Sequence, residues 1–156
     1  MIFVTTGTQL PFDRLLRMMD DIYPSLGGEE ILVQSFRGKY VPVNFDTVDF
    51  LHSADFKRVM NEARVIVAHA GIGTIMTAMN LRKPIVIVAR DSALGEHRND
   101  HQKATAEHLA RRCSLFVATS AEEMLAGIRE MPIPSPLPLT PSPELVTAIT
   151  EILERH

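Results

Sequence analysis

Short apolar runs alternate with amphipathic stretches along most of the chain. The apolar runs are rich in Val, Ile and Phe and show no helical period, which is typical of strands buried on both faces. They predict strands over residues 1–5, 30–36, 41–48, 64–68, 84–88 and 114–118, the third weakened by Pro42. The amphipathic stretches repeat apolar residues at helical spacing and predict helices over about 11–26, 53–62, 75–81, 100–112, 120–131 and 143–155.

This alternation predicts an α/β fold in which helices cover both faces of a parallel sheet. In such sheets ligands bind in the crevice at the carboxyl ends of the strands. Two helix starts carry cap signals: Ser53 opens one helix, and Ser120 with Glu123 forms a capping-box pair at another.

The C-terminal part of the chain has a different composition. Six of the ten prolines lie between Pro132 and Pro143, which predicts an extended connector. We therefore expect one folded domain over residues 1–131, a connector over 132–143 and a helix over 144–156. The pattern leaves open whether that helix packs on its own domain or on a partner.

Composition and charge narrow the class of protein. The 156 residues are 46% apolar and 22% charged with a net charge of −3, which indicates a globular chain without the basic surface that nucleic acid requires. The single cysteine, Cys113, excludes a disulfide framework and is typical of a reducing compartment. No apolar run is as long as a membrane span and residues 1–4 lack signal-peptide features, so we expect a cytoplasmic protein.

Two glycine-containing turns follow predicted strands. The candidate phosphate-binding residues in them are Thr6, Gly7, Thr8, His69, Gly71, Gly73 and Thr74. Glycine lets a backbone approach a ligand closely, and N–H groups at a helix start favour an anion such as phosphate. The alternative is that these glycines only form tight turns. Met76 stands where a full G-x-G-x-x-G fingerprint has its third glycine, which disfavours a nicotinamide cofactor.

A third candidate site is the polar loop that follows the predicted strand over 84–88. Its side chains offer donors and acceptors that suit a polyhydroxylated ligand: Glu96, His97, Arg98, Asp100, His101 and Gln102. A metal held by His97 and His101 is disfavoured because no third ligand is evident. The remaining alternative is a solvated loop with a helix cap at Asn99 or Asp100.

Several of these motifs together resemble the C-terminal domain of glycosyltransferase family 28. They are VAHAGIGT at 67–74, KPIVIV at 83–88 and NDHQ at 99–102. The opening FVTTGT at 3–8 and the string GEHRNDHQ at 95–102 are similar to stand-alone members of the family. Such members include the cytosolic subunit of the two-part N-acetylglucosaminyl transferase of dolichol-linked glycan assembly and bacterial exopolysaccharide subunits of the PssE type.

The resemblance implies a Rossmann-like fold equivalent to the C-terminal half of a GT-B transferase, and it implies site roles. The two glycine turns would hold the diphosphate of a UDP-sugar, and the 96–102 loop would meet the donor sugar. Many relatives carry a ribose-binding glutamate on the helix after the second turn, where this chain has Thr77. A threonine cannot accept from two ribose hydroxyls as a glutamate can. The assignment of uracil as the base therefore rests on the family resemblance alone.

The resemblance also implies a function. The chain would be the donor-binding subunit of an inverting two-component transferase in exopolysaccharide synthesis, with no metal or other cofactor. A membrane-anchored partner would carry the lipid-linked acceptor and the base, which would hold this chain at the cytoplasmic face of the membrane. The PssE type implies glucuronate, whose carboxylate would meet Arg98 or His97. The alternatives are an N-acetylglucosaminyl transferase subunit, an enzyme active alone, and a non-catalytic nucleotide-binding module.

Overall fold

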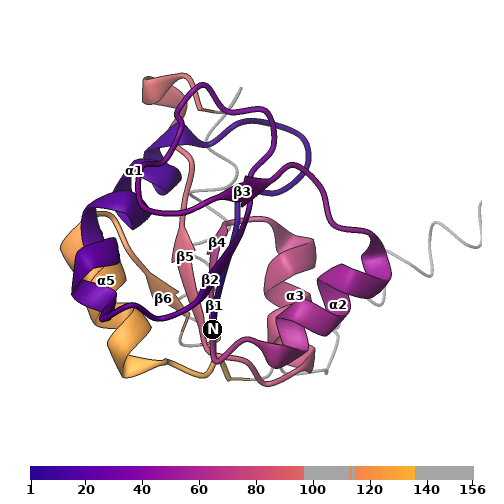
Figure 1. Ribbon diagram of the computed structural model, residues 1–156. Helices are drawn as coiled ribbons and strands as arrows, with labels where there is room; N and C mark the ends of the chain where they lie inside the picture. The colour runs from indigo at the N-terminus through magenta and orange to yellow at the C-terminus, as the bar shows by residue number, and fades with distance from the viewer. Residues whose placement is uncertain (97–112, 114, 136–156) are drawn as a thin grey trace, which may run out of the picture.

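The computed structural model describes residues 1–96, 113 and 115–135, and in this part of the chain the strands form one parallel sheet (Figure 1). The strand order is β3-β2-β1-β4-β5-β6. The strands are β1 (Ile2–Thr5), β2 (Ile31–Gln34), β3 (Thr47–Val48), β4 (Val65–His69), β5 (Ile85–Val88) and β6 (Phe116–Val117). The first strand therefore lies at the centre of the sheet, with β2 on one side and β4 on the other.

Helices cover both faces of this sheet, as the alternation of strands and helices predicts (Figure 1). One face carries α1 (Asp13–Ile22) and α5 (Ala121–Glu130), and the other carries α2 (Ser53–Glu62) and α3 (Ile72–Asn80). Successive strand residues point to opposite faces. Val4 belongs to the core under α1 and α5, whereas its neighbour Phe3 belongs to the core under α2 and α3.

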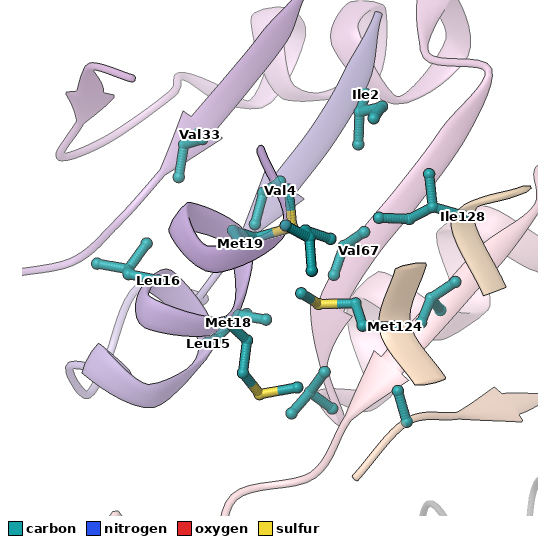
Figure 2. Close-up of a cluster of buried hydrophobic side chains, with 14 of the residues drawn as sticks. Ile2, Val4, Leu15, Leu16, Met18, Met19, Val33, Val67, Met124 and Ile128 are labelled. Atoms are coloured by element: carbon teal, nitrogen blue, oxygen red, sulfur yellow. The ribbon is translucent and has the colours of Figure 1, made fainter. Parts of the chain in front are cut away.

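The core under α1 and α5 consists of closely packed aliphatic side chains. Figure 2 shows side chains of both helices meeting those of β1, β2 and β4. The labelled residues are Ile2, Val4, Leu15, Leu16, Met18, Met19, Val33, Val67, Met124 and Ile128. All of them are buried, so this layer fixes α1 and the turn before it against the sheet.

Several predicted elements are shorter than expected, and two of them differ the most. The helix predicted over 11–26 begins at Asp13 and ends at Ile22, and a 3-10 turn, η1 (Tyr23–Leu26), follows because Pro24 has no N–H for a helical hydrogen bond. The strand predicted over 41–48 is reduced to Thr47–Val48. The N–H groups of Val43 and Asn44 donate to Asp20 of α1 and are not available to the sheet.

The helix starts also differ from the sequence prediction in part. Ser53 is not a cap: His52 occupies the N-cap position of α2, and its side chain forms no capping bond. Ser120 is confirmed as a cap, because its hydroxyl accepts a hydrogen bond from the Glu123 N–H at 3.2 Å. The Glu123 carboxylate accepts from the Thr119 N–H at 2.7 Å, so the capping box reaches back one residue further than usual.

Some predicted elements lie outside the described residues, namely the helix over 100–112, the connector beyond residue 135 and the helix over 144–156. Within the part that the structure describes, no helix combines the length and apolar character that crossing a membrane requires.

Candidate functional site

A cleft of about 680 Å³ opens at the carboxyl ends of the central strands, where the α/β topology places ligand sites. It is lined by both glycine turns, by the segment from Phe50 to Lys57 and by Arg90. The structure brings together eight residues predicted from the sequence: Thr6, Gly7, Thr8, His69, Gly71, Gly73, Thr74 and Thr77. The two turns meet because β1 and β4 are adjacent in parallel register, with Thr5 paired to Ala68.

The imidazole of His69 lies between the backbones of the two turns. A Cβ at Gly7 would stand 2.6 Å from His69 Cε1, and a Cβ at Gly71 would stand 2.2 Å from His69 Nε2. Gly7 also has a φ of 81°, in the left-handed region that favours glycine. The packing of His69 therefore already favours glycine at these two positions, whether or not a ligand approaches them.

Gly73 differs from these two glycines because it is exposed and no atom lies within 4 Å of the place of its missing Cβ. The helix α3 begins at Ile72, earlier than the sequence predicts, with Gly71 as its N-cap. The N–H groups of Ile72, Gly73 and Thr74 therefore belong to the first turn, where the backbone has no intrahelical acceptor. Together with the helix dipole they make this end of the cleft suitable for an anion.

Two of the predicted ligand residues already hold parts of the protein. Thr6 is fully buried, and its hydroxyl oxygen accepts from the Phe36 N–H at 3.1 Å, which ties the first turn to the segment after β2. The Thr77 hydroxyl donates to the Gly73 carbonyl at 2.8 Å. Its oxygen can still accept a hydrogen bond, so Thr77 can serve one donor of a ligand.

The structure does not bring Glu96 to the lining of the cleft. Its Oε1 accepts from Arg14 Nε at 2.8 Å, and its Oε2 accepts from Arg14 Nη2 at 2.8 Å and from the Asp91 N–H at 2.9 Å. The carboxylate thus fastens the segment after β5 to α1. The other predicted sugar-binding residues lie outside the described residues: His97, Arg98, Asp100, His101 and Gln102.

Sequence reasoning missed two parts of the cleft. One is its apolar end, formed by Phe50, Leu51 and Phe56, in which the Phe50 side chain is 58% exposed. The available signal was an aromatic residue two positions after the predicted strand over 41–48. The other is Arg90, which follows β5 and is 3% exposed.

The arrangement of the described side chains also bears on metal binding. Among residues 1–96, 113 and 115–135, no three His, Cys, Asp or Glu side chains come together in a way that could hold a metal ion. The absence of a metal from the site therefore stays a prediction.

The fold and the cleft define the class of protein as a doubly wound α/β domain with its ligand crevice at the carboxyl edge of the sheet. The glycosyltransferase family 28 C-terminal domain matches residues 1–153, and the chain belongs to this family.

The chain is similar to curated proteins named UDP-N-acetylglucosamine transferase subunit ALG13. It is 30% identical to the Mus musculus protein over 127 residues, which are 75% of this chain and 10% of the relative. It is 25% identical to the Yarrowia lipolytica protein over 136 residues, which are 80% of this chain and 67% of the relative. The chain thus spans about a tenth of the mammalian relative.

Solved structures share the fold. A solution NMR structure of ALG13 superposes with a TM-score of 0.57 at 18% identity, covering 98% of this chain and 96% of that one. The glycotransferase of kitacinnamycin superposes with a TM-score of 0.62 at 17% identity, covering 83% of this chain and 34% of that one. The predicted fold class and family are therefore confirmed.

Proposed function

We propose that this chain binds the UDP-sugar donor of a two-component glycosyltransferase. The observation that carries the proposal is the cleft itself, which is lined both by a helix N-terminus with open space at Gly73 and by the apolar side chains of Phe50, Leu51 and Phe56. A nucleoside diphosphate has matching parts, because its phosphates are anionic and its base is flat and largely apolar.

The diphosphate is assigned to the first turn of α3. Ile72, Gly73 and Thr74 supply backbone N–H groups there, and a side chain at Gly73 would occupy the space that a phosphate needs. Thr8, which is exposed in the opposite turn, adds a hydroxyl donor. His69 lies between the turns and lines the same space.

The nucleoside is assigned to the apolar end of the cleft. Phe50 offers an exposed ring on which a base can stack, and Leu51 and Phe56 provide further apolar surface. Thr77 follows the first turn of α3 and also lines the cleft, and its hydroxyl oxygen can accept from one ribose hydroxyl. Uracil is the proposed base because the similar curated proteins are named for UDP-N-acetylglucosamine.

The donor sugar has two candidates. The names of the curated relatives favour N-acetylglucosamine. The likeness to exopolysaccharide subunits favours glucuronate, whose carboxylate needs a cation such as Arg98 or His97. In either case we propose that the segment from His97 to Gln102 meets the sugar and that no metal takes part.

Inverting transfer needs a base for the acceptor hydroxyl and stabilisation of the departing diphosphate. The N–H groups at α3 can stabilise the diphosphate, which makes this chain the donor side of the reaction. We propose that a membrane-anchored partner supplies the base and a lipid-linked saccharide acceptor, in line with the word subunit in the names of the relatives. This arrangement would hold the chain at the cytoplasmic face of the membrane.

Calorimetry with UDP, UDP-N-acetylglucosamine and UDP-glucuronate tests the proposal. We expect UDP to bind and one of the two sugar nucleotides to bind more tightly than the other. Phe50→Ala should weaken UDP binding by about tenfold, since one stacked base contributes about 1–3 kcal/mol. Val43→Ala is the matched control, because Val43 is also exposed but does not line the cleft.

Absence of binding by all three nucleotides would refute the donor-binding function. Sugar transfer by the purified chain without any second protein would contradict the two-component part of the proposal and leave donor binding intact.

A further inference from the structure

Arg90 is a buried cation that lines the cleft. It follows β5, whose carboxyl end lies at the same edge of the sheet as those of β1 and β4 (Figure 1). The side chain lines the cleft although the residue is only 3% exposed. An arginine this deeply buried needs an explanation, because a charge loses its hydration when it leaves water.

One explanation is that Arg90 holds the first glycine turn. Its Nη2 donates to the Thr6 carbonyl at 2.7 Å and to the Leu10 carbonyl at 2.6 Å, which are the two ends of that turn. Its guanidinium carbon lies 5.0 Å from the centre of the Phe12 ring, so the side chain is also fixed by packing. The bonds draw two carbonyl oxygens toward Arg90.

These contacts do not neutralise the charge. Within residues 1–96, 113 and 115–135, Arg90 forms no ion pair, and its Nε has no hydrogen-bond partner. Glu96 acts on it only through its electrostatic field, since the Glu96 carboxylate is bonded to Arg14 and to the Asp91 N–H. Burial lowers the pKa of Arg90 to about 10, partly offset by Glu96, so the guanidinium stays protonated at neutral pH.

A buried cation beside a cleft, with no carboxylate partner among the described residues, favours an anionic ligand. We propose that Arg90 supplies the positive charge of the diphosphate site and also orders the Thr6–Leu10 turn that faces α3. The inference rests on the proposed function, because it names the group that recognises the phosphates of the nucleotide. The same charge would stabilise the diphosphate as it leaves the sugar.

The test compares UDP with uridine, which has the same base and ribose and no phosphate. Arg90→Met removes the charge and keeps an apolar side chain over Phe12. We expect it to weaken UDP binding by about tenfold or more while uridine binding changes less than about threefold. Arg17→Met is the matched control, since Arg17 is an exposed arginine on α1 that stacks on Tyr40 and does not line the cleft.

Equal losses of UDP and uridine affinity in Arg90→Met would show a purely structural role and overturn the inference. If the wild-type chain binds uridine and UDP equally, the diphosphate site itself is refuted, and if it binds neither, the proposed function fails.

A spectroscopic measurement on the wild-type chain keeps the test valid if Arg90→Met does not fold. The Arg90 Nε–H signal in proton–nitrogen spectra, assigned by its loss in Arg90→Lys, should shift on addition of UDP and not of uridine. The same shift with both ligands, or none with UDP, would overturn the inference.

Discussion

Gly73 lies in the first turn of α3 with no atom within 4 Å of the position that a Cβ would take, whereas a Cβ at Gly7 or Gly71 would collide with His69. Glycine at the latter two positions is explained by the folded chain alone. The folded chain does not explain glycine at position 73, because a helix with an interior glycine is less stable than the same helix with alanine by roughly 0.5–1 kcal/mol. The proposed phosphate site gives a physical reason for glycine at this position.

Gly73→Ala is therefore expected to separate stability from binding. The free energy of unfolding should rise by up to about 1 kcal/mol, because alanine is the better helix former. The affinity for UDP should fall by about tenfold, because the new methyl group enters the proposed phosphate space. Urea unfolding and calorimetry measure the two quantities on the same sample.

Asn80→Ala is the control on the same helix. Asn80 is exposed and does not line the cleft, so the variant should gain stability without losing UDP affinity. A Gly73→Ala protein that binds UDP as well as the wild type would show that the phosphates lie elsewhere.

At the scale of elements, Asp20 of α1 determines the course of the chain between β2 and β3. The residue is 6% exposed, and its carboxylate accepts from the Tyr40 hydroxyl at 2.6 Å, the Val43 N–H at 2.8 Å and the Asn44 N–H at 3.0 Å. Burial by itself raises the pKa of Asp20, but these hydrogen bonds outweigh it and hold the pKa below the ordinary 3.8. The loop is thus anchored through an ionised carboxylate.

Asp20→Asn should lower the free energy of unfolding at pH 7 by about 1–3 kcal/mol, because an amide cannot accept all of these bonds. Since the folded-state pKa is lowered, the contribution of Asp20 is fully present above the unfolded-state value near 3.8 and is lost as the pH falls through the folded-state value. The stability difference between wild type and variant should therefore be constant above about pH 5 and shrink below pH 4.

Urea unfolding across this pH range measures the difference, with Asp21→Asn as the control. Asp21 is exposed and next in sequence, so its variant should differ little from wild type at any pH. A stability difference for Asp20→Asn that is independent of pH would contradict the role of the ionised carboxylate.

At the scale of the whole molecule, the sheet of the described residues separates two cores and carries the cleft at its edge. Gly7 and Thr8 of the turn before α1 line the cleft, together with Gly71 and Gly73 at the start of α3. Since α1 and α3 pack on opposite faces of the sheet, the cleft is lined by residues from both sides. A ligand bound there contacts structures that depend on both cores. Binding should therefore stabilise the entire sheet and not one layer of it.

We expect heat to unfold the described domain in a single transition that UDP moves to higher temperature. At one hundred times its dissociation constant UDP should add about 2.7 kcal/mol, or roughly 5–10 °C for a domain of this size. Circular dichroism at peptide and aromatic wavelengths measures the midpoint temperature of unfolding with and without UDP. Two separate transitions, or a shift at only one of the two wavelengths, would contradict this coupling.

Much of the fold was predictable because it depends on local patterns. The continuous apolar runs in strands such as Ile2–Thr5 and Val65–His69 predict burial on both faces, and helical spacing predicts α1 and α5. One of the larger failures occurred where a distant group decided the outcome. The strand over 41–48 is mostly lost because Asp20, about twenty residues earlier, takes the N–H groups of Val43 and Asn44.

The same division applies to the candidate site. The sequence by itself determined that two glycine turns follow buried strands, because glycine, threonine and the end of an apolar run can be read locally. Only the tertiary structure decided that His69 fills the space between those turns, that Glu96 pairs with Arg14, and that Arg90 and Phe50 reach the cleft. These contacts depend on which strands are neighbours, and in a parallel sheet the neighbours are joined by long crossovers that no local pattern specifies.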